Sequence, residues 1–330
     1  MGTPAVLDRW SGEGVRLSEV VTAVASLHDR SREPHARTTT AVMTLVAVAA
    51  EEDHARRAAE AMRTLAGHHP ARIVLVRPYP DEAAYLSAEA TLYGSGGDEF
   101  IEVVFDVRGQ AARHLDSLVE AFTLPDLPVA VWYVSSLPDP GDPLLGVATV
   151  VVLDSRDAPD VSQLRGVLAL ARRSTVVDLC WKRLAPCREL VAGLFDPPHC
   201  RLWLPRVERA EVAGKSGPRR LLAGWLVAQT SLSPKNVTTR DARHVSLGLR
   251  ARGPGGEASF SLERPEGQRL FAAEAMVPGG AAVRGTAELP DDPLATSLAA
   301  ALTQMSPDPV WERALSVAAA VPDSAATAGR

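Results

Sequence analysis

The first half of the chain alternates buried apolar runs with amphipathic stretches, and this alternation predicts an α/β domain. Residues 16–30 place a recurring apolar set on one helical face: Leu17, Val20, Val21, Val24 and Leu27. The β-branched run at 38–50 predicts a buried strand, the acid-led segment 51–67 predicts a helix, and residues 71–78 predict a second buried strand. A strand, a helix and a strand in this order form a βαβ unit with parallel strands.

A hairpin follows, because two strand-like segments, 84–93 and 98–107, flank a glycine-rich turn. The turn, GSGGD at 94–98, leaves a strand and opens a strand, whereas a dinucleotide-binding loop must open a helix. Four more elements complete the first half: a helix at about 110–122, strands at 127–134 and 146–155, and a helix at 160–173. We expect a mixed sheet in this domain.

The second half has a different order of elements, which predicts an α+β domain. The expected elements are a strand at 201–212, a helix at 219–230, three or four short strands between about 242 and 289, and helices at about 292–304 and 308–320. At about 150 residues per domain, 330 residues suffice for two domains. We expect an α/β domain at 1–175, a smaller α+β domain at 176–320 and a disordered tail at 321–330.

Composition narrows the class of protein. The chain is 46% hydrophobic and 23% charged, as globular proteins are. Residues 1–177 carry a net charge of −8 and residues 178–330 one of +3, too little for a nucleic-acid-binding domain. There is no uncharged apolar run of about 18 residues and no signal peptide, so we expect a soluble cytoplasmic protein without a membrane partner. The excess of arginine over lysine is typical of high-GC codon usage, as in actinobacteria.

Two stretches could be mistaken for sites of chemistry. VAGKSGP at 212–218 contains Gly-Lys-Ser, but a phosphate-binding loop needs glycine where this chain has Arg209. Cys180, Cys187 and Cys200 have neither zinc-ligand spacing nor a separation that suits a disulfide. The sequence therefore nominates no catalytic, cofactor-binding or metal-binding residue, and no cofactor is expected.

The stretch DLCWKRLAPCREL, at 178–190, predicts a kinked helical corner. Asp178 suits the cap of a first helix, and Pro186 suits the first turn of a second. Cys187 recurs with Leu190, Val191 and Leu194 on one helical face, so we expect it in the core with Leu184. The remaining four residues form a candidate partner interface: Trp181, Lys182, Arg183 and Arg188. In the alternative interpretation the tryptophan is buried and the arginines cap carbonyl groups.

The same stretch resembles the Asp-Leu-x-Trp-x-Arg-Leu-x-Pro-Trp-Arg motif of the OpcA family of glucose-6-phosphate dehydrogenase assembly proteins. The matching positions are Asp178, Leu179, Trp181, Arg183, Leu184, Pro186 and Arg188. Cys187 stands where the family usually has tryptophan. HPARIVLV at 69–76, LPDLPVAVWYV at 124–134 and MSPDPVWERAL at 305–315 also resemble family segments, with Tyr133 in place of a tryptophan.

The resemblance implies a non-enzymatic factor that promotes the assembly and activity of glucose-6-phosphate dehydrogenase, the entry enzyme of the oxidative pentose phosphate pathway. Its partner would be the dehydrogenase, bound through a protein–protein interface. Two other interpretations stay open at this point. One is an enzyme that acts on a sugar phosphate or nucleotide with a site assembled from distant residues, and the other is a scaffold for a different partner.

Overall fold

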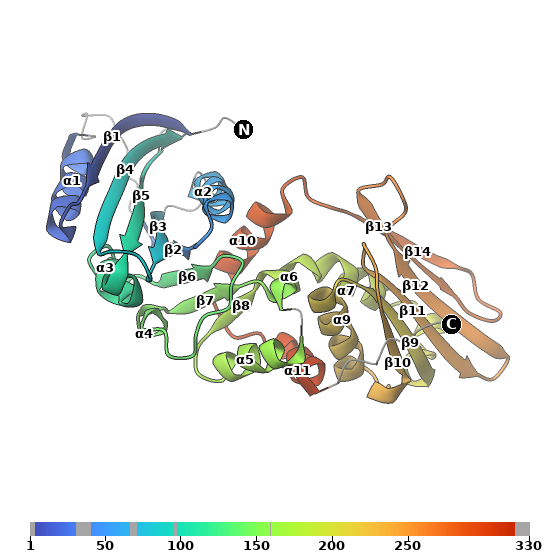
Figure 1. Cartoon of the computed structure of the whole chain (residues 1–330). Helices are drawn as coiled ribbons and strands as arrows, with labels where there is room; N and C mark the ends of the chain where they lie inside the picture. The colour runs from blue at the N-terminus through green and yellow to red at the C-terminus, as the bar shows by residue number, and fades with distance from the viewer. Residues whose placement is uncertain (1–3, 31–40, 67–70, 96–97, 159, 321–330) are drawn as a thin grey trace. The chain divides into compact units, whose positions relative to one another are not determined.

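Two mixed sheets organise the chain, one in each of two units (Figure 1). The computed structural model describes residues 4–30, 41–66, 71–95, 98–158 and 160–320. Unit 1 comprises residues 1–154, 174–177 and 294–306, and unit 2 comprises 155–173, 178–293 and 307–330. Both units are discontinuous in sequence. The expected boundary between residues 175 and 176 stays a prediction, and the expected tail at 321–330 lies outside the described residues.

The sheet of unit 1 has eight strands in the order β1-β4-β5-β3-β2-β6-β7-β8. Their bounds in that order are Ala5–Glu13, Tyr85–Ser95, Asp98–Arg108, Ala71–Tyr79, Met43–Val48, Val129–Tyr133, Val150–Leu153 and Val176–Asp178. The strands β1, β4 and β5 are antiparallel neighbours, and the pairs from β5 through β3, β2 and β6 to β7 are parallel. The predicted parallel pair β2–β3, the hairpin β4–β5 and the mixed sheet are confirmed.

Helices cover both faces of this sheet. Figure 1 shows α1 (Leu17–Arg30) and α2 (Glu52–Ala66) on opposite faces of the ribbon. The central strands β2, β6 and β7 are buried along their whole length, as strands covered on both faces must be. The predicted helix at 110–122 is divided into a 3-10 turn, Gly109–Arg113, and α3, Leu115–Glu120. The unit also contains α4 (Leu144–Val147) and α10 (Pro293–Thr303).

Unit 2 contains a six-stranded sheet in the order β10-β9-β11-β12-β13-β14. The bounds are Val237–Asp241, Val207–Gly214, Ser246–Gly253, Gly256–Glu263, Leu270–Met276 and Val283–Glu288. All neighbours are antiparallel except β10 and β9. One face packs against α7 (Ala185–Gly193) and α9 (Ser216–Gln229). The unit also contains α5 (Val161–Ala171), α6 (Leu179–Arg183), α8 (Pro198–Arg201) and α11 (Pro309–Ala320).

Several elements differ from the sequence-based expectation. Strands β1, β8 and β10 were not predicted, because β1 and β10 are sheet-edge strands with mostly exposed residues and β8 is only three residues long. The strand expected at 201–212 begins only at Val207. Residues 201–206 instead end α8 and form a 3-10 turn that contains Pro205, which lacks the N–H that a central strand needs. The strand expected from residue 146 begins at Val150, after α4.

Two glycines of α9 allow other backbone segments to approach closely. A Cβ atom added at Gly217 would collide with the carbonyl oxygen of Ser155, and one added at Gly224 would collide with that of Ala314 in α11. Gly217, which directly follows the Gly-Lys-Ser turn between β9 and α9, therefore has a packing role. Arg209 lies within β9, as expected.

The contact between α9 and α11 predicts the effect of one methyl group. Gly224→Ala should lower the free energy of unfolding by about 2 kcal/mol or more, because the two helices must separate. The matched control is Gly166→Ala in α5, where an added Cβ meets no atom within 4 Å. This control should be neutral or stabilise by about 1 kcal/mol. Urea denaturation of both variants measures the difference, and equal midpoints would contradict the close contact.

Candidate functional site

The segment 178–190 forms a helical corner in unit 2. Helix α6 ends at Arg183 and α7 begins at Ala185, with Pro186 in its first turn. Asp178 caps α6, since its Oδ1 accepts the Cys180 backbone N–H at 2.9 Å. Asp178 thus lies at the start of the first helix and Pro186 in the first turn of the second.

Apolar side chains fix this corner in the core. The buried set is Leu179, Cys180, Trp181, Leu184, Cys187, Val191 and Leu194. Cys187 and Leu184 are core residues, as predicted, whereas Leu190 is half-buried near Gly285 of β14.

Asp178 is buried and receives donors from three segments of unit 2. Asp178 is only 2% exposed. Its Oδ1 accepts the backbone N–H of Ser155 at 3.0 Å, and its Oδ2 accepts the Ser155 hydroxyl at 2.6 Å and the Trp311 indole N–H at 3.2 Å. A buried carboxylate is tolerated when its oxygens are hydrogen-bonded in this way. Asp178 thus joins the start of α6 to the segment at Ser155 and to α11.

Asp308 repeats this arrangement at the start of α11. Its Oδ1 accepts the backbone N–H groups of Val310 and Trp311, each at 3.0 Å. Its Oδ2 accepts the indole N–H of Trp181 at 2.8 Å. Each of the two capping aspartates therefore accepts an indole N–H from the helix that the other one caps. We call this pair of contacts the reciprocal clasp: Asp178–Trp311 and Asp308–Trp181.

The cations of the corner lie beside the clasp. The Arg188 guanidinium stacks on the Trp181 ring, with its central carbon 3.5 Å from the ring centroid. Its Nη2 donates to the Trp181 carbonyl at 3.4 Å, and its Nε is buried without a hydrogen-bond partner among the described residues. Burial lowers the pKa of Arg188 and also that of Lys182. Lys182, Arg183 and Arg188 are partly exposed.

Burial corrects one part of the candidate interface. Trp181 is 1% exposed, so its ring offers almost no surface to a partner. The ring is instead the platform on which Arg188 lies, and its indole N–H is committed to Asp308. An interface role for Lys182, Arg183 and Arg188 stays a prediction.

The cysteines are buried thiols. Cys180, Cys187 and Cys200 form no disulfide. Burial raises the pKa of Cys187 to about 12, which suppresses the reactive thiolate. Within the described ranges, no group of three or more His, Cys, Asp or Glu side chains is arranged to hold a metal ion.

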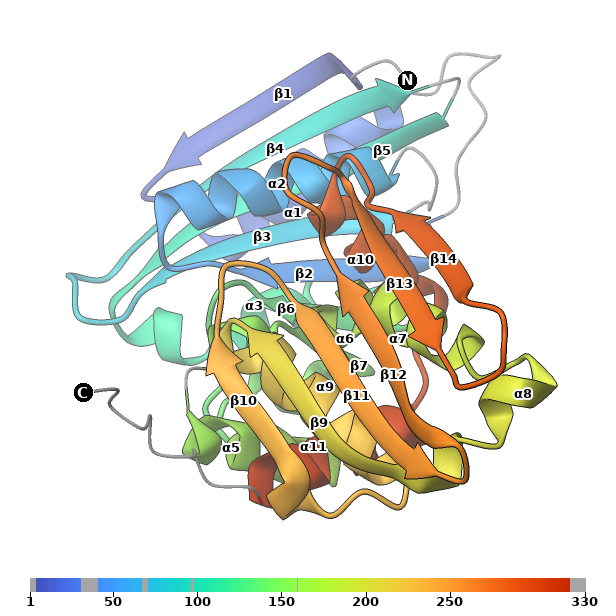
Figure 2. The same ribbon diagram turned by 90° about the vertical axis from the view of Figure 1, so that its right-hand side faces the viewer.

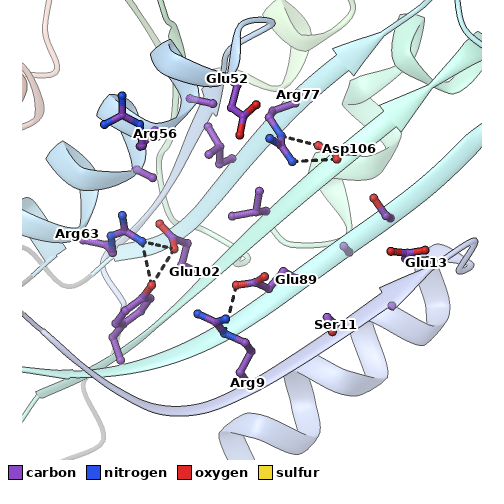
Figure 3. A pocket seen from close by; sticks show the side chains of 18 residues that line it. Arg9, Ser11, Glu13, Glu52, Arg56, Arg63, Arg77, Glu89, Glu102 and Asp106 are labelled. Atoms are coloured by element: carbon purple, nitrogen blue, oxygen red, sulfur yellow. Dashed lines mark hydrogen bonds and ion pairs between the residues drawn. The ribbon is translucent and has the colours of Figure 1, made fainter.

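Unit 1 contains a separate polar cleft, which was not found from the sequence (Figure 3). It has a volume of about 530 Å³ and lies between α2 and strands β1, β4, β5 and β3. The strand register places its charged residues on one sheet face, with Arg9 opposite Thr91, Thr91 opposite Glu102, and Asp106 opposite Arg77. The alternation of charged and apolar residues in β4 and β5 was the available signal, but the cleft also needs residues of three other elements.

Glu102 is the most buried carboxylate of this cleft. Its Oε2 accepts Arg63 at 3.2 Å and the Tyr93 hydroxyl at 3.3 Å, whereas its Oε1 has no hydrogen-bond partner among the described residues. Burial raises the pKa of Glu102, the nearby Glu89 raises it further, and Arg63 opposes the shift. The other ion pairs of the cleft are Arg77–Asp106 and Arg9–Glu89. The cleft is therefore nearly balanced in charge, and it contains one carboxyl group whose pKa is raised.

Comparison with known proteins gives a consistent family assignment. The model of the glucose-6-phosphate dehydrogenase subunit N-terminal domain matches residues 62–188, and that of the C-terminal domain matches residues 174–315. Both matches include residues 178–188 of the corner. No helix of the described residues has the length and apolar character that a membrane span requires.

Three curated relatives are named OxPP cycle protein OpcA. The protein of Synechocystis sp. is 26% identical over 187 residues, covering 52% of this chain and 39% of the relative. That of Synechococcus elongatus is 27% identical over 194 residues, covering 54% and 43% respectively. That of Nostoc punctiforme is 25% identical over 186 residues, covering 52% and 40%. The matched region thus spans less than half the length of these relatives.

Similarity to solved structures is lower. A dehydrogenase from Chromobacterium violaceum gives a TM-score of 0.44 at 10% identity, covering 86% of this chain and 94% of that chain. An oxidoreductase from Magnetospirillum magnetotacticum gives 0.37 at 14% identity, covering 84% and 98%. Scores at this level do not establish a common fold, and they indicate nothing about catalysis in this chain.

The reciprocal clasp predicts an order of stability losses. Asp178→Ala should cost about 3 kcal/mol or more, because buried donors of Ser155, Cys180 and Trp311 lose their acceptor. Trp311→Phe keeps most of the ring but removes one donor, and should cost about 1–2 kcal/mol. The control is Asp160→Ala at the exposed cap of α5, which should lose much less. Denaturant unfolding measures the stability of all three variants. A loss for Asp178→Ala that is no larger than the loss for Asp160→Ala would contradict the clasp.

The polar cleft predicts a pH-dependent stability. Because the pKa of Glu102 is raised in the folded state, the folded chain holds this proton more tightly than the unfolded chain does. The wild type should therefore lose stability relative to Glu102→Gln as the pH rises from the usual glutamate value of 4.5 through the raised pKa. Urea titrations of both proteins across this range test the sign. A stability difference that does not change with pH, or changes in the opposite direction, would show that Glu102 does not hold a proton more tightly when folded.

Proposed function

Because this chain belongs to the glucose-6-phosphate dehydrogenase subunit family, we propose that it is a non-catalytic binding partner of glucose-6-phosphate dehydrogenase. In this role it promotes assembly or activity of the enzyme in the oxidative pentose phosphate pathway. The observation that carries the proposal is the match of the two family models, which together extend from residue 62 to residue 315.

The structure of the corner supports a binding role over a catalytic one. The two models overlap at residues 174–188, where Asp178 and the tryptophan of the motif are committed to the reciprocal clasp. A carboxylate whose oxygens already accept four hydrogen bonds has little capacity to act as a general base. The family motif is therefore explained by architecture, with its cations at the surface.

Activation then follows from differential binding. A partner that binds the active oligomer of the dehydrogenase more tightly than the inactive form shifts the equilibrium between them by that difference in affinity. A preference of about 1.4 kcal/mol produces a tenfold shift. No chemistry within this chain is needed for such an effect.

The cations of the corner are the first candidate contact with the dehydrogenase. Arg188 is held flat on Trp181, so its guanidinium is preorganised, and its only hydrogen bond among the described residues is long. A planar guanidinium in this state suits a carboxylate or carbonyl group of a partner. Lys182 and Arg183 lie on the preceding helix and add positive charge.

An enzymatic role is the second candidate, and one observation favours it. The cleft of unit 1 contains a carboxyl group with a raised pKa, which is a common feature of acid–base catalysts. The arginines around this carboxyl group favour the binding role instead. Arg9, Arg63 and Arg77 already form ion pairs within the cleft, so they are not available to bind an anionic substrate. Under the proposed function, Glu102→Gln leaves activation of the dehydrogenase unchanged.

The test of the proposed function is a pair of substitutions in the corner. Arg188→Ala should weaken binding to the dehydrogenase about thirtyfold, the equivalent of about 2 kcal/mol, if the guanidinium is desolvated in the complex. Arg188→Lys keeps the charge but loses the planar stack, so it should recover only part of the affinity. Calorimetry measures binding, and dehydrogenase activity with and without the chain measures activation.

Arg183→Ala and thermal unfolding of each variant complete this experiment. A folded Arg188→Ala variant with weakened binding supports the corner as an interface. If Arg183→Ala and Arg188→Ala both fold and bind normally, the corner is structural only. A wild-type chain that neither binds nor activates the dehydrogenase would refute the proposed function itself.

A further inference from the structure

In the part of unit 2 that the structure describes, helices α7 and α9 pack against one face of the six-stranded sheet, and no helix of the unit packs against the other. Figure 2 shows its strands side by side, with α7 and α9 behind them. Among the described residues, apolar side chains of β9, β11, β12 and β13 are buried on the helix side, and polar residues alternate with them on the other side. We call this second side the open face.

A glycine lies in the middle of the open face without a structural requirement for it. Gly248 is an interior residue of β11, it has no positive φ, and an added Cβ would meet no atom within 4 Å. Glycine inside a strand costs about 0.5–1 kcal/mol relative to alanine. Such a glycine often marks a place where a ligand or another backbone approaches closely.

Small neighbours extend the space above Gly248 into a trough. The register places Gly248 opposite Glu211 of β9 and Ser261 of β12, and places Ser259 opposite Arg250. The trough has a volume of about 590 Å³. Gly248, Ser259 and Ser261 thus form its floor. They offer hydroxyl groups and accessible backbone to a bound molecule.

The rim of the trough is positively charged. Arg209 of β9 lies directly opposite Arg250 of β11, an arrangement of like charges that destabilises a sheet. Glu257 pairs with Arg250 at 2.5 Å, whereas Arg209 and Lys235 form no ion pair with any residue that the structure describes. The one acidic residue of the lining, Glu211, is paired with Arg240 on β10 at 2.8 Å.

From this combination we infer that the trough on the open face is a docking site for an acidic segment of the protein partner. A carboxylate of that segment pairs with Arg209 and Lys235, and its backbone lies close to Gly248. This placement gives Arg209 and Lys235 a counter-charge, and it explains why position 248 has no side chain. The inference rests on the proposed function, because it assigns a second contact surface for the same partner.

Filling the trough tests this inference without removing a contact of the fold. Gly248→Val places a β-branched side chain in open space, so the melting temperature should stay equal or rise, while binding to the dehydrogenase weakens about tenfold or more. Arg209→Glu should weaken binding similarly and reduce its dependence on salt. The matched controls are Gly166→Ala and Arg173→Glu on α5 and its C-terminal turn, which should bind as the wild type does.

The outcomes separate this inference from the proposed function. Wild-type binding with weakened Gly248→Val and Arg209→Glu supports the docking site. Wild-type binding with normal binding by both variants overturns the docking site and leaves the proposed function standing. Binding of inorganic phosphate to the free chain that is lost in Arg209→Glu, with dehydrogenase binding intact, overturns it in favour of a small-anion site. A wild-type chain that does not bind the dehydrogenase overturns both.

Discussion

Two hydrogen bonds from tryptophan indole N–H groups to helix-capping aspartates organise unit 2. Asp178 and Asp308 each begin a helix, and each accepts a tryptophan donor from the helix that the other begins. Asp178 also holds Ser155, whose carbonyl lies so close to Gly217 that no side chain fits there. The starts of α6, α11 and α9 are thereby related through one buried carboxylate. Hydrogen bonds of this kind give specific geometry, because a buried donor without its acceptor is costly.

Local signals predicted the elements that depend on local physics. Asp178 and Pro186 indicated a capped, kinked corner, and the glycine-rich turn indicated the hairpin β4–β5. The clasp was not predictable in this way, since Asp178 and Trp311 are far apart in the sequence and neither residue alone indicates a partner. The polar cleft of unit 1 depends on strand register and on a helix that lies across it, and neither follows from alternation within one strand. The interface role of Trp181 was a reasonable inference from residue type, but burial assigned the ring to the core.

Most residues of the family motif are committed to the architecture of the corner, and its two arginines, Arg183 and Arg188, are partly exposed. The motif fixes helices, while its cations and the open face of the sheet supply charge at the surface of the same unit. A substitution in the motif can therefore abolish function by unfolding the corner, and only a folded variant reports on recognition.

The buried thiols of the corner have a practical consequence. Cys180 and Cys187 lie in the two helices on either side of the kink, and neither has significant exposed surface. A thiol reagent can modify them only when the corner opens, so the labelling rate measures the opening equilibrium directly. Because the chain carries only three cysteines, all of them buried, this signal has little background. The two thiols thus report the local unfolding of the corner. A partner that binds over the corner would slow their labelling.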